Sequence, residues 1–275
     1  MSNTYNEQAT KLLKLGRPES DWQDYLALGI TREDIPELLR LVQDNELRFL
    51  EPPDDFLDDE DLPEWYAQIH AWRTLAQLKA EEAIPAILGI LHQIEDDDDD
   101  WLSSDVHLVF GMIGPAVIEP LKKYLADENN PIYARSTTGS SLAEIGNRYP
   151  EERERCIQGI SAVLEKYETN DDGLNGFLIG DLIDLKAVEQ IDLIKRAFEA
   201  EAVDEFINGD VEDVQIEMGL LEKRLTPERP LRFGRFSPES DGYIAPIPKS
   251  GKVEKKAKNK RKQEKKSRKK NRKKK

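Results

Sequence analysis

Cysteine, histidine and long apolar runs are all scarce in this 275-residue sequence. Cys156 is the one cysteine, which excludes an intramolecular disulfide and fits a reducing compartment. No apolar run approaches the roughly 18 residues needed to span a bilayer. The N-terminus also lacks the basic and apolar regions of a signal peptide. These absences predict a soluble cytoplasmic protein without a membrane partner.

Recognisable catalytic and metal-binding motifs are missing as well. Zinc ligation needs about four converging ligands, whereas His70, His92 and His107 are scattered with no i, i+4 pair. The sequence contains no P-loop, dinucleotide fingerprint or nucleophile elbow. The run Asp96–Asp100 lacks the spacing and turn glycine of a calcium loop, so a solvated acidic loop is the better interpretation. We therefore predict no metal, no cofactor and no catalytic residue, and Cys156 should be a core thiol.

Charge is distributed very unevenly along the chain, whose net charge is −15. Residues 249–275 hold 17 basic and two acidic side chains, a net of +15, and only Val253 and Ala257 are hydrophobic. The other 248 residues hold 23 basic and 53 acidic side chains, a net of −30. This asymmetry indicates an interaction tail on an acidic body. The tail is too polar to offset its ordering entropy, so we expect it to be disordered.

A leucine-rich helical motif recurs at start-to-start spacings of 35, 32 and 40 residues. A period in that range is typical of stacked helix pairs, in which no single unit buries its apolar face alone. The motif occurs at Leu75–Leu78, Phe110–Ile113, Leu142–Ile145 and Leu182–Leu185.

A second amphipathic segment follows each motif, with apolar residues at helical spacing on one face. Gly114-Pro115, and Gly146 with Pro150, supply the turn chemistry that ends one helix and starts the next. The predicted fold class is all-α: an α-solenoid of stacked antiparallel helix pairs with a disordered C-terminal tail. The apolar faces are Ile84, Ile87, Leu88 and Leu91; Val117, Leu121, Tyr124 and Leu125; Ile157, Ile160, Leu164 and Tyr167; and Ala187, Ile191, Ile194 and Phe198.

Composition divides the chain into five stretches. Helices are predicted before Gly16, between Ser20 and Gly29, and after Thr31, where Asp34 completes an N-cap. Pro63 suits the first turn of the next helix. The stretches are N-terminal helices packed on the array (1–50), an acidic loop (51–62), HEAT-like helical repeats (63–220), an irregular segment (221–248) and the Lys/Arg-rich tail (249–275).

Four segments carry a family resemblance: Ile69–Leu75, Phe110–Pro115, Leu174–Leu178 and Asp213–Gln215. The repeats resemble the HEAT-like superfamily of α-solenoids, including the phycobilisome-lyase-type repeats, and are most similar to an uncharacterised bacterial HEAT-like family. The resemblance covers roughly residues 8–220 and implies a helical-repeat fold with no established activity. Some proteins of that kind end in a Cys-rich zinc knuckle, which this chain cannot form because no cysteine follows Cys156.

Two groups of residues are candidate binding sites. Trp65, Tyr66, His70 and Trp72 are either core packing or an exposed surface that anchors a protein partner. The tail is either a solubility tail in contact with the acidic body or a sequence-independent, salt-sensitive contact with nucleic acid. Without interleaved aromatic residues, base readout is not supported. The tail residues expected to contact nucleic acid or another acidic surface are Lys260, Arg261, Lys262, Lys265, Lys266, Arg268, Lys269, Lys270 and Arg272.

The leading functional prediction is a noncatalytic scaffold. Its second helices would line a concave face for a basic protein partner, and its tail would contact RNA, DNA or the ribosome. The alternative is an enzyme of lyase or hydrolase type that uses the solenoid groove. A deep pocket with converging carboxylates and His70 would favour the enzyme, whereas a shallow acidic face would favour the scaffold. The partner's identity and the oligomeric state stay open.

Overall fold

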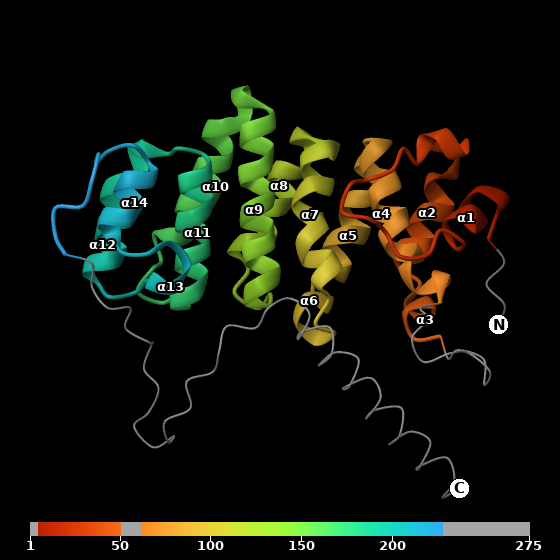
Figure 1. Ribbon diagram of the computed structural model, residues 1–275, viewed down its shortest axis with the longest axis horizontal. Coiled ribbons are helices and arrows are strands. Elements are labelled where there is room, and N and C mark those ends of the chain that lie inside the picture. Colours follow the sequence, from red (N-terminus) through yellow and green to blue (C-terminus); the bar gives the residue numbers. More distant parts are fainter. Residues whose placement is uncertain (1–4, 51–61, 228–275) are drawn as a thin grey trace, which may run out of the picture. The chain divides into compact units, whose positions relative to one another are not determined.

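The computed structural model describes residues 5–50 and 62–227, which belong to one compact unit. Every regular element in these two ranges is a helix, and the helices follow one another in chain order as a row of antiparallel pairs (Figure 1). This confirms the predicted α-solenoid. None of these helices alone is long and apolar enough to cross a membrane. The segments Asp100–Ile113 and Pro115–Ala126 reach the required length and composition only when they are taken together, and they are bent by 114° relative to each other. Residues 51–61, 228–248 and the tail 249–275 lie outside the described residues.

Four helix pairs form the array. In each pair, a first helix that carries the leucine-rich motif near its C-terminal end is followed by a short 3₁₀ turn and a second helix. The first helices pack on one another in sequence, and α8, α10 and α12 form a second layer behind them. The pairs are α4 (Ala67–Gln77) with α5 (Ile84–Ile90), α7 (Asp100–Ile113) with α8 (Ile118–Ala126), α9 (Ile132–Arg148) with α10 (Arg153–Leu164), and α11 (Asp172–Asp184) with α12 (Ile191–Glu199).

The turns after α4, α7 and α11 each contain a residue with positive φ. Lys79 and Lys186 both adopt φ of 50° directly after a first helix. At the first of these turns the Ala80 N–H donates to the Leu75 carbonyl at 3.0 Å, which closes the helix end in a Schellman motif. Gly114, with φ of 99°, takes this place after α7. The 3₁₀ turns are η4 (Glu81–Ala83), η5 (Pro115–Val117), η6 (Pro150–Glu152) and η7 (Val188–Gln190).

The N-terminal segment packs on α4 through two helices, α1 and α2. The helix predicted between Ser20 and Gly29 is wrong, since only a 3₁₀ turn forms there. Asp24 Oδ1 accepts the N–H groups of Leu26 and Ala27, and such a side-chain turn competes with a helix. The Tyr25 side chain is buried in the core. The elements are α1 (Glu7–Leu12), η1 (Leu26–Leu28), η2 (Arg32–Asp34), α2 (Ile35–Val42), α3 (Asn45–Arg48) and η3 (Pro63–Tyr66).

Three predicted helix boundaries in this region are confirmed. Gly29 ends η1 with φ of 82°. Thr31 caps the next turn, and its own N–H donates to Asp34 Oδ2 at 2.9 Å, which completes a capping box. Pro63 lies in the first turn of η3. Each boundary depends on residues within about one turn of chain, which is why the sequence predicts it.

The acidic run Asp96–Asp100 is largely exposed, and residues 97–99 lie between two helices, which agrees with the predicted solvated acidic loop. Glu95 and the following residue belong to α6 (Gln93–Asp96). Asp99 caps α7, because its Oδ1 accepts the Leu102 N–H at 2.9 Å. Arg48 pairs with Asp99 at 2.8 Å and neutralises part of the run. Asp99 therefore connects this exposed loop to α7 and to Arg48.

Two short helices follow the last pair: α13 (Glu205–Asn208) and α14 (Val211–Glu217). The first packs on α11 and the second on α12. Asp210 caps α14 through a capping box with Asp213, and Arg224 pairs with both carboxylates. These helices border the first-helix layer at the C-terminal end of the array, where they contribute to the site described next.

Candidate functional site

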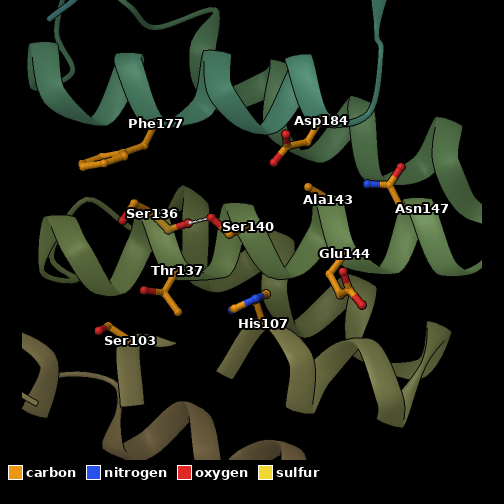
Figure 2. Close-up of a pocket in the computed structure, with 10 residues that line it drawn as sticks. All are labelled: Ser103, His107, Ser136, Thr137, Ser140, Ala143, Glu144, Asn147, Phe177 and Asp184. Carbon is orange, nitrogen blue, oxygen red and sulfur yellow. Dashed lines mark hydrogen bonds between the residues drawn. The ribbon is translucent and has the colours of Figure 1, made fainter. Parts of the chain in front are cut away.

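A pocket of about 480 Å³ lies on the first-helix layer, across three successive units. Figure 2 shows α11 on one side, α9 in the middle and α7 on the other side. The prediction put the binding face on the second helices, whereas this hollow lies on the first helices. Its lining residues are Ser103 and His107 of α7; Ser136, Thr137, Ser140, Ala143, Glu144 and Asn147 of α9; and Phe177 and Asp184 of α11.

A second pocket, of about 230 Å³, continues the first one toward α13 and α14. The two pockets share Ser140, Phe177 and Asp184, so we treat them as one feature and call it the first-helix groove. The other lining residues of the second pocket are Gly180, Asp181, Ile183, Ile207, Asn208 and Glu217.

Small side chains on α9 create the space for this groove. Ser136, Gly139, Ser140 and Ala143 recur at i, i+3, i+4 and i+7, so they lie on one face of the helix. A Cβ added to Gly139 would come within 2.3 Å of Asp181 Oδ2 on α11. The glycine therefore lets the carboxyl of α11 approach the backbone of α9.

Asp181 is the most unusual group of the groove. Its side chain is 4% exposed. One oxygen accepts the Ser140 hydroxyl at 2.9 Å, while Oδ2 has no hydrogen-bond partner among the described residues. Burial, and secondarily the nearby charge of Asp184, raise the pKa of this carboxyl well above its ordinary value of 3.8. The environment of Asp181 therefore favours the protonated form of this carboxyl over its ionised form.

His107 and Glu144 occupy the other end of the groove. Burial lowers the pKa of His107, against the opposing charge of Glu144, so the imidazole is neutral at pH 7. Glu144 pairs with Arg148 at 2.7 Å. The Ser103 hydroxyl donates to the Asp100 carbonyl in its own helix. Within the described ranges, no group of His, Cys, Asp or Glu is placed to hold a metal ion.

The predicted aromatic cluster is divided by the structure. His70 and Trp72 are each 2% exposed, so neither side chain can present a recognition surface. The His70 ring nitrogens lie 2.8 Å from Tyr25 Oη and 2.8 Å from the Gly16 carbonyl, and burial lowers the pKa of the ring. His70 is thus a core histidine held by the N-terminal segment, and it does not line the groove.

Trp72 belongs to a buried ion-pair network. Its indole N–H donates to Asp105 Oδ2 at 2.9 Å. Arg73 binds both oxygens of the same carboxylate, at 2.6 and 2.9 Å, so the buried charges are paired. Trp65 and Tyr66 keep part of their surface, and their role in partner binding stays a prediction.

The tail residues from Lys260 to Arg272 lie outside the described residues. Sequence reasoning named no groove residue as a candidate binding or catalytic residue, and it treated His107 as an ordinary histidine. The available signal was the face of small residues on α9, together with Asp181 in the middle of an otherwise apolar segment.

Comparison with known proteins identifies a family. The family described as “Protein of unknown function (DUF1186)” matches residues 27–226, which include all four helix pairs. No curated protein and no solved structure matches the chain.

Proposed function

We propose that this chain, which belongs to the family described as “Protein of unknown function (DUF1186)”, is a noncatalytic helical-repeat scaffold for a protein partner. A basic segment of the partner lies in the first-helix groove. The tail, residues 249–275, adds nonspecific electrostatic contacts to RNA, DNA or the ribosome. In this proposal the repeats are HEAT-like and the location is cytoplasmic, as a single buried free thiol, Cys156, supports.

The composition of the groove carries this proposal. Small-molecule pockets of roughly 300–1,000 Å³ are mostly apolar, with few polar groups. The larger pocket has about 480 Å³, and all of its lining residues except Ala143 and Phe177 have polar side chains. These groups come from three successive units, as expected when a repeat array binds an extended segment across neighbouring repeats.

The charge of the groove indicates a basic segment. No lysine or arginine is among the lining residues of the two pockets. Asp184 and Glu217 are exposed, and neither has an ion-pair partner among the described residues. Since the chain outside its tail carries a net charge of −30, its field attracts a basic segment and accelerates the encounter.

One observation favours the enzyme alternative. His107 is a neutral imidazole in the same pocket as Ser103 and Glu144, and these residue types serve as base, nucleophile and carboxylate in hydrolases. Their observed contacts favour the scaffold. Ser103 donates to its own helix and Glu144 pairs with Arg148, so the three side chains form no hydrogen-bonded relay.

Site-specific photo-crosslinking in living cells tests the proposed function. A photoreactive residue would replace Asn147, which is exposed in the groove. The matched control would replace Glu165, an exposed residue that caps the C-terminal end of α10 and does not line the groove. We expect a nuclease-resistant protein crosslink from position 147 that maps to a Lys/Arg-rich segment, and none from position 165.

Equal crosslinking from the two positions would contradict a groove-specific partner. A crosslink that nuclease removes would instead indicate nucleic acid. If position 147 crosslinks only to a small molecule, and His107→Ala abolishes that crosslink, the result would favour the enzyme alternative over the scaffold.

A further inference from the structure

The smaller pocket of the groove, which we call the acidic pocket, is built from hydrogen-bond acceptors. Asp181 Oδ2 is buried and has no partner among the described residues. Asn208 also lines the pocket; its Nδ2 donates to the Gly176 carbonyl at 2.6 Å, and its Oδ1 can accept a further hydrogen bond. Two further carboxylates, Asp184 and Glu217, form the exposed rim.

The Ser140 hydroxyl and the backbone N–H groups of this pocket are already used as donors. The Ser140 hydroxyl donates to Asp181 Oδ1 at 2.9 Å. Gly180 and Ile183 lie within α11, whose backbone N–H groups are used inside the helix. Carboxylate acceptors therefore outnumber the free donors, so a ligand that supplies donors is favoured, and phosphate or carboxylate groups are disfavoured by the same charges.

Size and shape narrow the ligand to a single side chain. The volume of about 230 Å³ is below the roughly 300–1,000 Å³ of typical small-molecule pockets. The Phe177 ring forms part of the wall, and it is held edge-on by Tyr133 with ring centroids 6.1 Å apart. A planar guanidinium can stack on such a ring, and it carries five donors and no acceptor.

A metal ion does not fit the same carboxylates. In the part of the chain that the structure describes, no three His, Cys, Asp or Glu side chains converge as ligands. Asp181 lies at the floor of the pocket, whereas Asp184 and Glu217 lie at its rim. Acceptors spread in this way suit the forked donors of a guanidinium better than one central ion.

We propose that the acidic pocket binds one arginine side chain of the partner's basic segment, with Asp181 at the floor and Asp184 and Glu217 at the rim. This inference rests on the proposed function. It adds the residue that anchors the segment, and it predicts that arginine is preferred over lysine because a compact ammonium cannot reach acceptors on both floor and rim.

Amide NMR of the full-length protein tests the inference. The probe is an acetylated and amidated nine-residue peptide of glycine and serine with one central arginine. Matched peptides carry lysine or citrulline, which is neutral and close in shape to arginine. We expect saturable shifts at Gly180 and Asn208 with the arginine peptide, and at least tenfold weaker binding of the citrulline peptide.

Conservative variants assign the contacts. Asp181→Asn keeps an acceptor for Ser140 but cannot ionise. It should therefore weaken binding of the arginine peptide at least tenfold. Asp184→Asn and Glu217→Gln should each weaken it by a few-fold, since rim charges are screened by solvent. Glu165→Gln removes the same charge from the exposed surface of α10 and should change the affinity by less than twofold.

The pH dependence of peptide binding distinguishes a charged contact by Asp181 from a purely structural role of this residue. Asp181 must ionise to pair with the cation, and burial opposes that ionisation. Affinity should therefore rise with pH in the native protein, and much less in Asp181→Asn. Asp184, Glu217 and the neighbouring His107 are present in both proteins, so the comparison isolates the contribution of Asp181.

Equal binding of the arginine and citrulline peptides, or undiminished binding by Asp181→Asn, would overturn the inference. Its failure is separable from failure of the proposed function. A protein crosslink from position 147 without an arginine response rejects the anchor and keeps the scaffold. An arginine response without any crosslink keeps the pocket and rejects the scaffold.

Discussion

Asp181 makes the folded protein sensitive to pH at the scale of a single residue. Its raised pKa means that the folded chain retains a proton that the unfolded chain loses above the ordinary value of 3.8. Stability therefore falls as pH rises above that value, by up to about 1.4 kcal/mol per pH unit, until the folded pKa is passed. We expect Asp181→Asn to be more stable than the native protein at pH 7, and equal to it near pH 4.

Urea unfolding at several pH values between 4 and 7 checks this expectation. The quantity to compare is the native-minus-variant difference in the free energy of unfolding, because other titrating groups cancel in it. Glu165 is exposed, so the free energy of unfolding of Glu165→Gln should stay within about 0.5 kcal/mol of the native value at every pH. A difference for Asp181→Asn that does not change with pH would show that its carboxyl is ionised in the fold.

Cys156 is expected to be chemically silent. The residue is fully buried on α10, and burial raises the pKa of its thiol to about 11. Because the thiolate is the reactive form, the native protein should react with a thiol reagent at pH 8 at least about 100-fold more slowly than the urea-unfolded protein. A stopped-flow assay with an aromatic disulfide measures both rates, and similar rates would place this thiol at the surface.

At the scale of the helix pair, Leu142 joins α9 to α10. Its side chain is 0% exposed, and a Cβ added to Gly159 of α10 would lie 3.3 Å from Leu142 Cδ1. Leu142→Ala should cost about 2–5 kcal/mol through lost transfer energy and a cavity. Each unit contacts mainly its neighbours, so part of the loss should appear as local unfolding.

Urea melts of Leu142→Ala and of Leu225→Ala form a matched pair. Leu225 is 75% exposed, so the same truncation there should change the free energy of unfolding by less than about 0.5 kcal/mol. Overlapping melts of the two variants would show that Leu142 contributes no packing between the helices.

The N-terminus of α9 depends on a carboxylate from another element. Its N-cap, Pro131, provides no side-chain cap. Glu95 Oε1 instead accepts the N–H groups of Tyr133 at 2.5 Å and Ala134 at 3.3 Å. This contact satisfies two free donors and places a negative charge at the positive end of the helix dipole.

Glu95→Ala should therefore destabilise the protein by about 0.5–2 kcal/mol. Hydrogen exchange should accelerate at the amides of Tyr133 and Ala134 before it does elsewhere in α9. Glu168→Ala removes an exposed carboxylate from the α10–α11 connection and should leave both observables near their native values. Unchanged exchange at the two amides of the Glu95 variant would contradict the capping role.

At the scale of the whole molecule, the charge asymmetry predicts where nucleic acid binds. Residues 249–275 carry a net charge of +15, while the rest of the chain carries −30 and repels phosphate. We expect deletion of residues 249–275 to remove most binding to labelled RNA and DNA. Binding by the full chain should vary little with base sequence, because unpositioned Lys and Arg contact only the backbone.

Salt dependence gives this prediction a magnitude. If roughly six to ten phosphates are neutralised, affinity should fall about 10³–10⁵-fold between 50 and 200 mM salt. Equal binding by the full and truncated chains would refute the role of the tail. Absence of binding by both would favour the alternatives of a solubility tail or a contact with the acidic body.

Local chemistry explains which parts of the fold were predictable. The first helices, the second helices and the boundaries at Gly29, Thr31 and Pro63 depend on side-chain periodicity and on caps within one turn. Such signals are present in any short window of sequence. The array follows from them, because repeated amphipathic helices can bury their apolar faces only against neighbouring units.

Tertiary packing decided the rest. His70 looks like a candidate site residue in the sequence, yet contacts with Gly16 and Tyr25, more than 40 positions away, bury it. The groove joins Ser103 to Phe177 across three helices, and its polar residues resemble an ordinary solvated surface in the sequence. The sequence by itself determined the helices and their order, because those depend on local periodicity and caps. Only the tertiary structure decided which polar side chains share a cavity and which carboxyl is left there without a partner, since burial depends on segments far apart in the chain.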